Sequence, residues 1–422
     1  MVGCGLVEEG YFEIEINIKI YMTKNKGKKI GCLIATHPGQ NNYGTSLQGF
    51  ATLRVAAKAG YPIEIIRYKH TRDIAFTLRT LIPYLCSGGI SGYLRRKKRG
   101  ADMKANEEYR RTYLIRRAAV DAFKEEVFER IAHVYTGFNE LHEGSKNYDV
   151  VFVGSDQVWG PLSLYRGFYN LLFVDDSVKK FSYASSFGVS EIFPWQRKGT
   201  ARFLNRLDMI SVREQRGAEI VRELTGRVAK VALDPTMLLT KAEWEACIKE
   251  WDDHRKRTSE PKSIDEPYIL TYILGERADI REEIKKLSRD SGVKIVNLPH
   301  IDIYHAMDEG LGDIDLYDVD PLDFVRLVRD AAYVATDSFH GTVFSILMHK
   351  KFITFYRAQP TSKGSTHSRI DSLLAMFGLE SRLFKDDAWT QIQPEIDYAE
   401  VDRKMTKQRE DSMKFFLEGL NL

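Results

Sequence analysis

The 422-residue sequence contains no apolar run near the roughly 20 residues that a membrane-spanning helix needs. Its four cysteines are far apart and none is in a CxxC pair, so a disulfide framework or zinc site is not expected and a reducing cytoplasm is favoured. The formal net charge is only +3, which argues against nucleic acid as a partner. With 43% hydrophobic residues and this length, the chain is expected to form two globular domains.

Several common active-site motifs are also missing. The sequence has no GxxxxGK[ST], no GxGxxG after a strand, no HExxH and no GxSxG. These absences argue against P-loop, dinucleotide-binding, zinc-peptidase and hydrolase-elbow chemistry, and no metal ligand spacing is present.

Short apolar strands alternate with helical segments along most of the chain, which predicts the α/β class with two doubly wound parallel sheets. A charged, proline-containing and apolar-poor stretch interrupts this alternation and is interpreted as a linker. The predicted organisation is an N-terminal extension (1–28), a first Rossmann-like domain (29–251) with a basic helical insert (about 72–128), a linker (252–267), a second Rossmann-like domain (268–390) and a helical tail (391–422). Within the extension, Phe12–Ile20 is either an additional strand or poorly ordered.

The stretch GSDQVWG follows a buried strand, where ligands bind in open α/β sheets. Asp156 could act as a general base or accept hydrogen bonds from sugar hydroxyls, and Trp159 could stack on a sugar. Alternatively, the Ser and Asp of this loop only cap the next helix. The candidate acceptor-binding residues are Asn42, Gln157 and Trp159.

Two further strand ends indicate an anion site. Arg213, in SVREQRG, is suited to a carboxylate or phosphate, although an ion pair with Glu214 or another acid is the alternative. In DSFHGT, Ser338 is a candidate N-cap, and the helix start that continues through Gly341 and Thr342 offers amides to an anion. His340 is the titratable partner at this position.

Two basic features remain open. Arg369 begins an apolar helix and either brings a second guanidinium to the anion or lies on the surface. The run Arg95–Arg99 is interpreted first as a solvated helix face and second as a contact with an acidic membrane surface.

Seven stretches, in this order, resemble the polysaccharide pyruvyl transferase family: NNYGTSLQGFA, YDVVFVGSDQVW, SYASSFG, SVREQRG, LDPTMLL, DSFHGTVFSI and SRIDSLL. They run from about Lys29 to Leu383 and leave out the basic insert and the first 28 residues. The resemblance implies two Rossmann-like domains in a GT-B-like arrangement. It also implies transfer of a pyruvyl group from phosphoenolpyruvate to a pair of sugar hydroxyls, giving a pyruvate ketal.

The resemblance assigns Arg213 and His340 to the donor. Family members often have Arg-Leu before this His, whereas this chain has Ser338-Phe339. Either Arg369 or Lys363 is therefore expected to supply the missing positive charge, or the donor differs. His340 would be the general acid, since a group that titrates near neutrality suits proton delivery to the donor.

Two other functions stay open, namely a nucleotide-sugar glycosyltransferase on the same scaffold and a non-catalytic glycan-binding protein. The expected partners are phosphoenolpyruvate and a glycan or lipid-linked glycan, without a cofactor. The expected location is the cytoplasm, with membrane contact through Arg95–Arg99 as an option.

Overall fold

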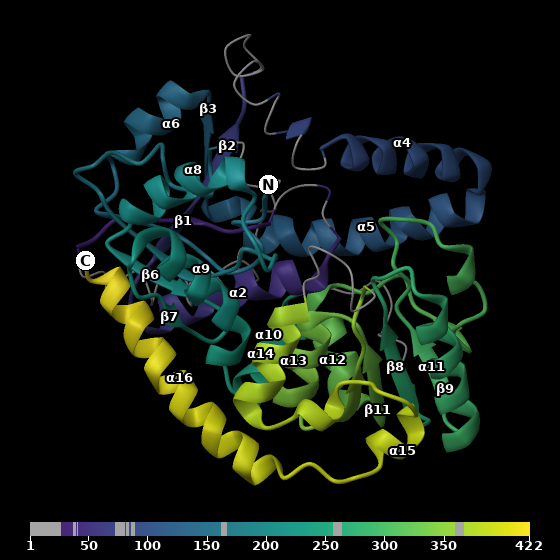
Figure 1. The fold of residues 1–422 in the computed structure, drawn as a ribbon. Coiled ribbons are helices and arrows are strands. Elements are labelled where there is room, and N and C mark those ends of the chain that lie inside the picture. The colour runs from purple at the N-terminus through teal and green to yellow at the C-terminus, as the bar shows by residue number, and fades with distance from the viewer. Residues whose placement is uncertain are drawn as a thin grey trace, which may run out of the picture.

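A computed structural model of the protein describes residues 27–36, 39, 41–71, 81, 84–85, 89–161, 167–255, 264–358 and 367–422. In these residues the chain forms two β-sheets, one of seven strands and one of five, in which all paired strands are parallel (Figure 1). Helices cover both faces of each sheet, so the predicted α/β class with two doubly wound sheets is confirmed.

The seven-stranded sheet has the order β3-β2-β1-β4-β5-β6-β7. Side chains of successive strand residues point to opposite faces, so Val150 and Phe152 of β4 belong to one hydrophobic cluster and Val151 and Val153 to another. The strands are β1 (Ile30–Leu33), β2 (Ile63–Lys69), β3 (Ala132–Thr136), β4 (Val150–Val153), β5 (Lys179–Ser185), β6 (Met209–Val212) and β7 (Lys230–Val231). The first face is covered by α2 (Tyr43–Lys58) and α5 (Glu107–Val127), and the second by α6 (Phe138–Ser145), α8 (Pro194–Asn205) and α9 (Gln215–Thr225).

The five-stranded sheet has the order β10-β9-β8-β11-β12. Its strands are β8 (Tyr268–Tyr272), β9 (Lys294–Asn297), β10 (Ile314–Asp315), β11 (Tyr333–Thr336) and β12 (Lys351–Thr354). One face packs on α12 (Pro321–Asp330) and α13 (Phe339–Leu347), and the other on α11 (Ala278–Ser291) and α15 (Ala388–Ile392). The short helix η2 (Pro235–Leu238) and α10 (Lys241–His254) connect the sheets along the chain.

The two halves of the molecule share one hydrophobic core. Tyr43 of α2 stacks on Phe324 of α12 with ring centroids 5.0 Å apart, and Trp244 of α10 meets Phe344 of α13 edge-on at 5.0 Å. This apolar contact holds the carboxyl ends of the two sets of strands in a fixed relation, which the site described below requires.

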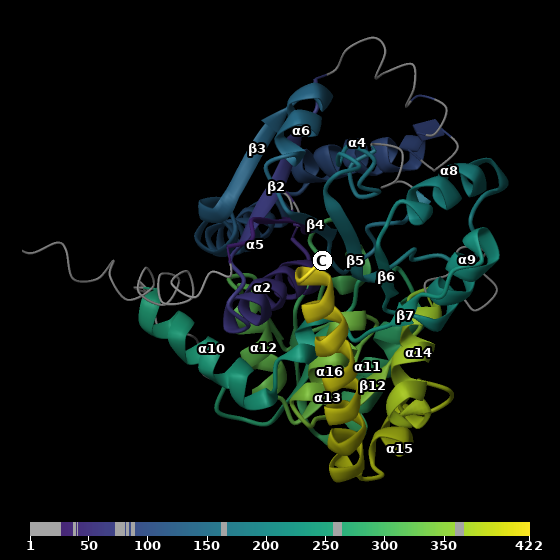
Figure 2. The same cartoon turned by 90° about the vertical axis from the view of Figure 1, so that its left-hand side faces the viewer.

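The long helix expected near the C-terminus is α16 (Tyr398–Leu420), which crosses from the second sheet back to the first (Figure 2). There, Phe416 packs against Tyr183 of β5 at 4.8 Å, and Ser412 Oγ accepts a hydrogen bond from the backbone N–H of Leu233 at 3.0 Å. The tail therefore forms part of the core of the first half, although it follows the second half in sequence.

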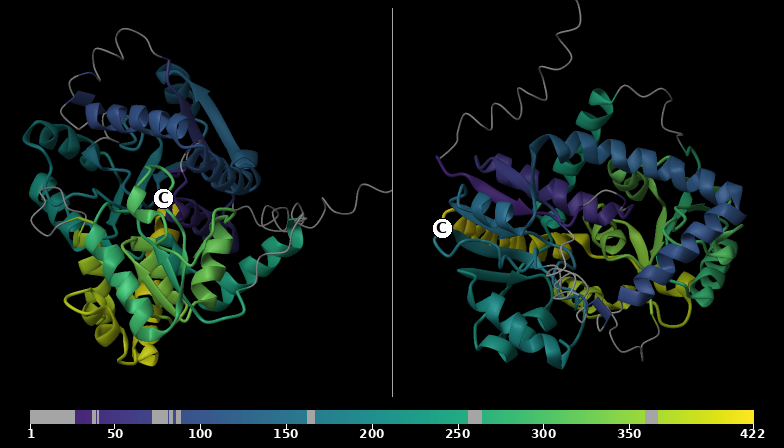
Figure 3. Two further views of the ribbon diagram at one scale, coloured as in Figure 1. Left: turned by 90° about the vertical axis from the view of Figure 1, so that its right-hand side faces the viewer. Right: turned by 90° about the horizontal axis from the view of Figure 1, so that it is seen from above.

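Some predicted features fall wholly or partly outside the described residues. The possible strand Phe12–Ile20 and Lys363 both lie there. In the predicted linker, α10 continues to His254 and residues 256–263 are not described, so the boundary at 252–267 stays a prediction. The basic insert contains two described helices, α4 (Gly89–Ala105) and α5, which lie side by side at one edge of the molecule (Figures 1 and 3).

Candidate functional site

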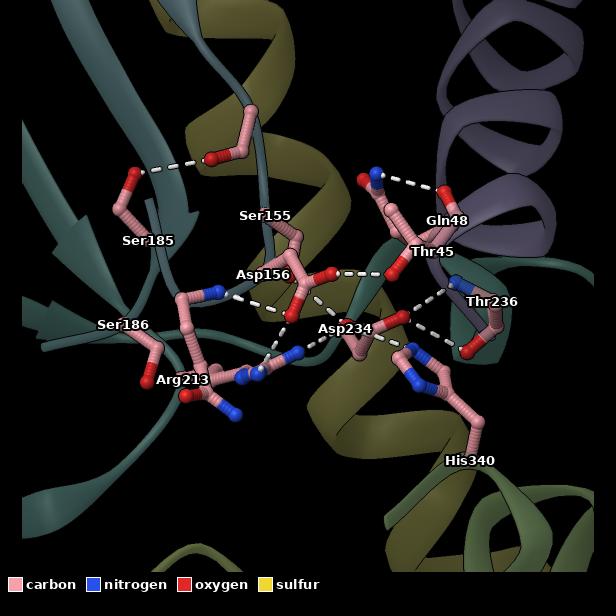
Figure 4. A network of polar contacts seen from close by, with 12 residues as sticks. Thr45, Gln48, Ser155, Asp156, Ser185, Ser186, Arg213, Asp234, Thr236 and His340 are labelled. Atoms are coloured by element: carbon pink, nitrogen blue, oxygen red, sulfur yellow. Dashed lines mark hydrogen bonds and ion pairs between the residues drawn. The ribbon is translucent and has the colours of Figure 1, made fainter. Parts of the chain in front are cut away.

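A cluster of buried polar residues lies where the carboxyl ends of strands from both sheets face each other (Figure 4). β4 leads to Ser155 and Asp156, β6 leads to Arg213, and β7 leads to Asp234. From the second sheet, β11 leads to His340 in the first turn of α13. Ligands of open α/β sheets bind at this edge, so we take the cluster as the candidate active site.

Asp234 is the central carboxylate of the cluster. Its side chain is fully buried and accepts hydrogen bonds from Ser155 Oγ at 2.7 Å and from the Thr236 hydroxyl at 2.8 Å. Arg213 Nη1 donates to it at 3.1 Å. Burial alone would raise the pKa of Asp234, but the charges of His340 and Arg213 and these hydrogen bonds outweigh burial and lower it. Asp234 is therefore a fixed negative charge between Arg213 and His340.

Asp156 is the second carboxylate on Arg213, with Oδ1 3.3 Å from Nη2. Its other oxygen accepts a hydrogen bond from Thr45 Oγ1 of α2 at 2.7 Å. Burial would raise the pKa of Asp156, but Arg213, His340 and these hydrogen bonds lower it. Its backbone φ of 86° is a left-handed conformation that costs a non-glycine residue about 1–3 kcal/mol, and such strain concentrates at functional sites.

His340 points across the boundary between the halves and lies against the first. Its Nε2 is 3.6 Å from Asp234 Oδ2 and has no hydrogen-bond partner among the described residues. The ring also packs on Gly44 of α2, where an added Cβ would come within 2.0 Å of Nδ1. Glycine at position 44 is thus required for His340 to reach Asp234.

Arg369, on α14 (His367–Phe377), is a buried guanidinium without a carboxylate partner in the described part of the chain. With the Gln157 amide oriented so that its oxygen faces Arg369, both Nη atoms of Arg369 donate to that oxygen at 2.9 Å, and Nε has no partner among the described residues. Arg369 and Arg213 both lie over the ring of Phe339, at 5.8 and 4.6 Å from its centroid. Burial and the charge of Arg213 lower the pKa of Arg369 to about 9, which shows that its charge is poorly compensated.

Glu214 completes the ring of charges but does not neutralise Arg369. Its Oε1 accepts hydrogen bonds from Ser186 Oγ at 2.8 Å and from the backbone N–H of Phe187 at 3.3 Å. Its Oε2 is 4.0 Å from Arg213 Nε. Burial raises the pKa of Glu214 in spite of the nearby arginines, so the negative charge here is weakly held.

The predicted helix start is present, but its polar groups serve the fold. Ser338 is the N-cap of α13 and accepts from the Gly341 N–H at 3.3 Å, while the Thr342 hydroxyl donates to the Ser338 carbonyl at 3.1 Å. Gly341 and Thr342 were expected to offer amides to an anion, but in this conformation both residues bond within the helix start and are not available. The first-turn amides that remain for a ligand are those of Phe339 and His340.

The candidate acceptor residues lie in different surroundings. Trp159 is fully buried against Phe187 and Phe203, and its indole N–H donates to the Tyr169 carbonyl, so no sugar can stack on it. Asn42 is the N-cap of α2, where its side chain accepts from the Thr45 N–H at 3.2 Å. Among the described contacts of these three residues, the one to a charged site residue is made by Gln157, to Arg369.

Asp234 is not among the residues predicted from the sequence, although the rule that led to Asp156 and Arg213 also applies to it. In LDPTMLL the Asp comes shortly after a strand and precedes a proline, which places it at the same edge of the sheet. Thr45 and Gly44 had no comparable signal, because both lie inside a helix. Their contacts with Asp156 of the same half and with His340 of the other half are set only by three-dimensional packing.

Within the described ranges, no group of three or more His, Cys, Asp or Glu side chains is arranged to hold a metal ion. None of the helices described there is both long and apolar enough to cross a lipid bilayer.

Solved structures with a similar fold are sugar-processing enzymes. A UDP-N-acetylglucosamine 2-epimerase matches with a TM-score of 0.50 and 10% identity, covering 93% of this chain and 95% of its own. The UDP-GlcNAc 2-epimerase from Neisseria meningitidis matches with a TM-score of 0.47 and 9% identity, covering 93% and 99%. A glycosyltransferase from Rickettsia africae matches with a TM-score of 0.46 and 12% identity, covering 94% and 99%. The expected GT-B-like arrangement of two Rossmann-like domains is confirmed.

No curated protein sequence shows significant similarity to the chain. The family model described as polysaccharide pyruvyl transferase matches residues 42–359, which include Asp156, Arg213, Asp234 and His340. The match covers most of the chain and every strand of both sheets except β1, so the protein belongs to the polysaccharide pyruvyl transferase family.

Proposed function

We propose that this enzyme transfers a pyruvyl group from phosphoenolpyruvate to two hydroxyls of a sugar and forms a cyclic ketal. The observation that carries the proposal is the pair Arg213 and Arg369, because the second of these buried guanidiniums has no carboxylate partner among the described residues. A buried charge of this kind is costly unless a ligand compensates it. A donor with both a carboxylate and a phosphate supplies that compensation.

Arg369 takes the place of the arginine that family members often carry before the histidine. In this chain that position is Ser338, and the ring of the next residue, Phe339, lies against both guanidiniums. Gln157 holds Arg369 through both Nη atoms and leaves Nε for a ligand. A planar guanidinium with a free edge is suited to a carboxylate or a phosphate.

The chemistry proceeds by proton addition and two attacks at one carbon. His340 Nε2 gives a proton to C3 of phosphoenolpyruvate, and C2 becomes an oxocarbenium-like centre. The first sugar hydroxyl bonds to C2 and its proton returns to His340. The C2–O bond to phosphate then breaks, the second hydroxyl bonds to C2, and its proton leaves with the phosphate.

Asp156 and Asp234 act in this scheme as fixed charges. A carboxylate whose pKa is lowered is a weak base, so Asp156 is poorly suited to remove a hydroxyl proton. It holds Arg213 and Thr45 in place instead. Asp234 holds Arg213 and faces His340 on its other side.

We expect the acceptor to be a glycan or a lipid-linked glycan and the reaction to take place in the cytoplasm. The described cysteines, Cys32 and Cys247, are free and buried, which suits a reducing compartment.

The test is release of inorganic phosphate from phosphoenolpyruvate in the presence of a panel of acceptor glycans, with the ketal detected by mass spectrometry. Dependence of phosphate release on a glycan supports the proposal. Release of a nucleoside diphosphate from nucleotide sugars, with no reaction of phosphoenolpyruvate, would identify a glycosyltransferase instead. Glycan binding without turnover of either donor would identify a binding protein.

A further inference from the structure

The outer face of α4 is an apolar and basic surface separate from the polar cluster. Ile90, Tyr93 and Leu94 are 52%, 55% and 56% exposed. Their spacing of three and four residues places them on one side of the helix. Arg99, on the opposite side, lies over the ring of Tyr113 of α5 at 5.6 Å. Among the described residues the long helix on which α4 packs is α5, which lies beside it in Figures 1 and 3. The helical spacing therefore places the apolar side chains on the side of α4 opposite to the one that faces α5.

The same helix is strongly basic. It carries one acid, Asp102, and six basic residues, namely Arg95, Arg96, Lys97, Lys98, Arg99 and Lys104. Lys97 and Lys98 are exposed and continue the apolar face toward the C-terminal end of the helix. Long basic side chains can place their charge in a polar layer while apolar neighbours enter a less polar one. A helix that combines an apolar face with a basic one is typical of proteins that lie on anionic membranes.

We propose that α4 docks this enzyme on an anionic lipid bilayer. Ile90, Tyr93 and Leu94 enter the boundary between headgroups and acyl chains, and the neighbouring lysines and arginines contact lipid phosphates. Exposed aliphatic side chains among the basic ones favour a bilayer as the partner, because the bilayer can bury them. Binding to nucleic acid relies on contacts between basic side chains and phosphates and does not require exposed aliphatic side chains.

The position of α4 would allow docking to bring a lipid-linked acceptor to the site, and this step rests on the proposed function. Asp302 lies 3.7 Å from Arg99 of α4 and also accepts a hydrogen bond from Asn41 at 2.8 Å. Asn41 precedes the N-cap residue of α2, and Thr45 of that helix contacts Asp156. Docking through α4 thus holds a lipid-linked acceptor near the site.

The test is co-sedimentation of the full chain with vesicles of phosphatidylglycerol and phosphatidylcholine, compared with vesicles of phosphatidylcholine alone. We expect binding only to the anionic vesicles and weaker binding at high salt. Lys97→Glu/Lys98→Glu should weaken binding by roughly tenfold or more, and Ile90→Ser/Leu94→Ser should also weaken it. The control Lys407→Glu/Lys414→Glu makes the same charge change at exposed positions of α16 and should bind as the unmodified protein does.

Equal binding to both vesicles, no binding, or equal losses in the α4 and α16 variants would overturn the proposal. A dimer that Ile90→Ser/Leu94→Ser dissociates would also overturn it, because the face would then be covered by a second copy. Phosphate release with a water-soluble acceptor should be unchanged in the α4 variants. If vesicle binding follows the prediction but phosphoenolpyruvate is never consumed, the membrane proposal stands and the proposed function fails.

Discussion

Two buried arginines of this protein contrast in how far their charge is satisfied. Arg116 of α5 donates Nε and Nη2 to the backbone carbonyls of Tyr317 and Leu316 at 2.9 and 2.6 Å, and it lies over the ring of Tyr43. Within the described residues, Arg369 has one amide oxygen as its partner, an unpaired Nε and a second guanidinium nearby. The first arrangement joins α5 to the second half of the molecule. We infer that an anion completes the second, because an uncompensated buried charge is typical of a ligand site and not of a structural contact.

A buried and a surface histidine also contrast, and the largest effect on turnover is expected at the buried one. His340→Ala should lower turnover by roughly a hundredfold or more if His340 is the general acid. His340→Asn separates two roles, because Asn can donate a hydrogen bond to phosphate but cannot deliver a titratable proton. An acid role leaves the Asn variant nearly as slow as the Ala variant, and a phosphate-binding role leaves it partly active.

The matched control is His349, whose Nε2 also faces an aspartate, Asp402, at 3.0 Å, but at the surface. His349→Ala should leave turnover unchanged. If both histidine variants lose activity equally, the assignment of His340 to the chemistry is refuted.

The next effect concerns Arg213. Arg213→Lys keeps the charge but cannot reach Asp156 and Asp234 at the same time, since lysine lacks the planar fork. We expect weaker phosphoenolpyruvate binding in calorimetry and a lower Tm, because one buried carboxylate loses its partner. Donor affinity equal to that of the unmodified protein would remove Arg213 from the donor site.

Much of this arrangement could be predicted from sequence, because strand ends in a parallel sheet converge at one edge. That rule located Asp156, Arg213 and His340 without any knowledge of the fold. It failed for Trp159, since a tryptophan after a strand is as well suited to a core as to a sugar, and only three-dimensional packing decides between them. It also could not show that Gly341 and Thr342 would bond within their own helix start.

A direct comparison of the two arginines uses the same substitution at both. Arg369→Met should abolish donor binding and yet raise Tm, because it removes a poorly compensated buried charge. Arg116→Met should lower the free energy of unfolding by about 1–3 kcal/mol, because two backbone carbonyls lose their donors. Thermal unfolding and phosphoenolpyruvate titration of both variants check this. A lower Tm for Arg369→Met would mean that its charge is better satisfied than the contacts indicate.

The smallest effect is expected at Glu214, and it depends on pH. Burial raises the pKa of Glu214 in the folded protein above its ordinary value of 4.5, so the folded state binds this proton more readily than the unfolded state does. Stability from this group is therefore greatest at low pH and falls as pH rises through the raised pKa. Glu214→Gln keeps an oxygen for Ser186 and Phe187 but carries no charge. Its Tm should be equal to or slightly above that of the unmodified protein at neutral pH, and the difference should vanish as pH falls toward 4.5.

Asp156→Asn should behave in the opposite way and lower Tm at neutral pH, because the pKa of Asp156 is lowered and its charge holds Arg213. Equal responses of the two variants would show that the two carboxylates contribute alike to stability, which would contradict the opposite shifts of their pKa values.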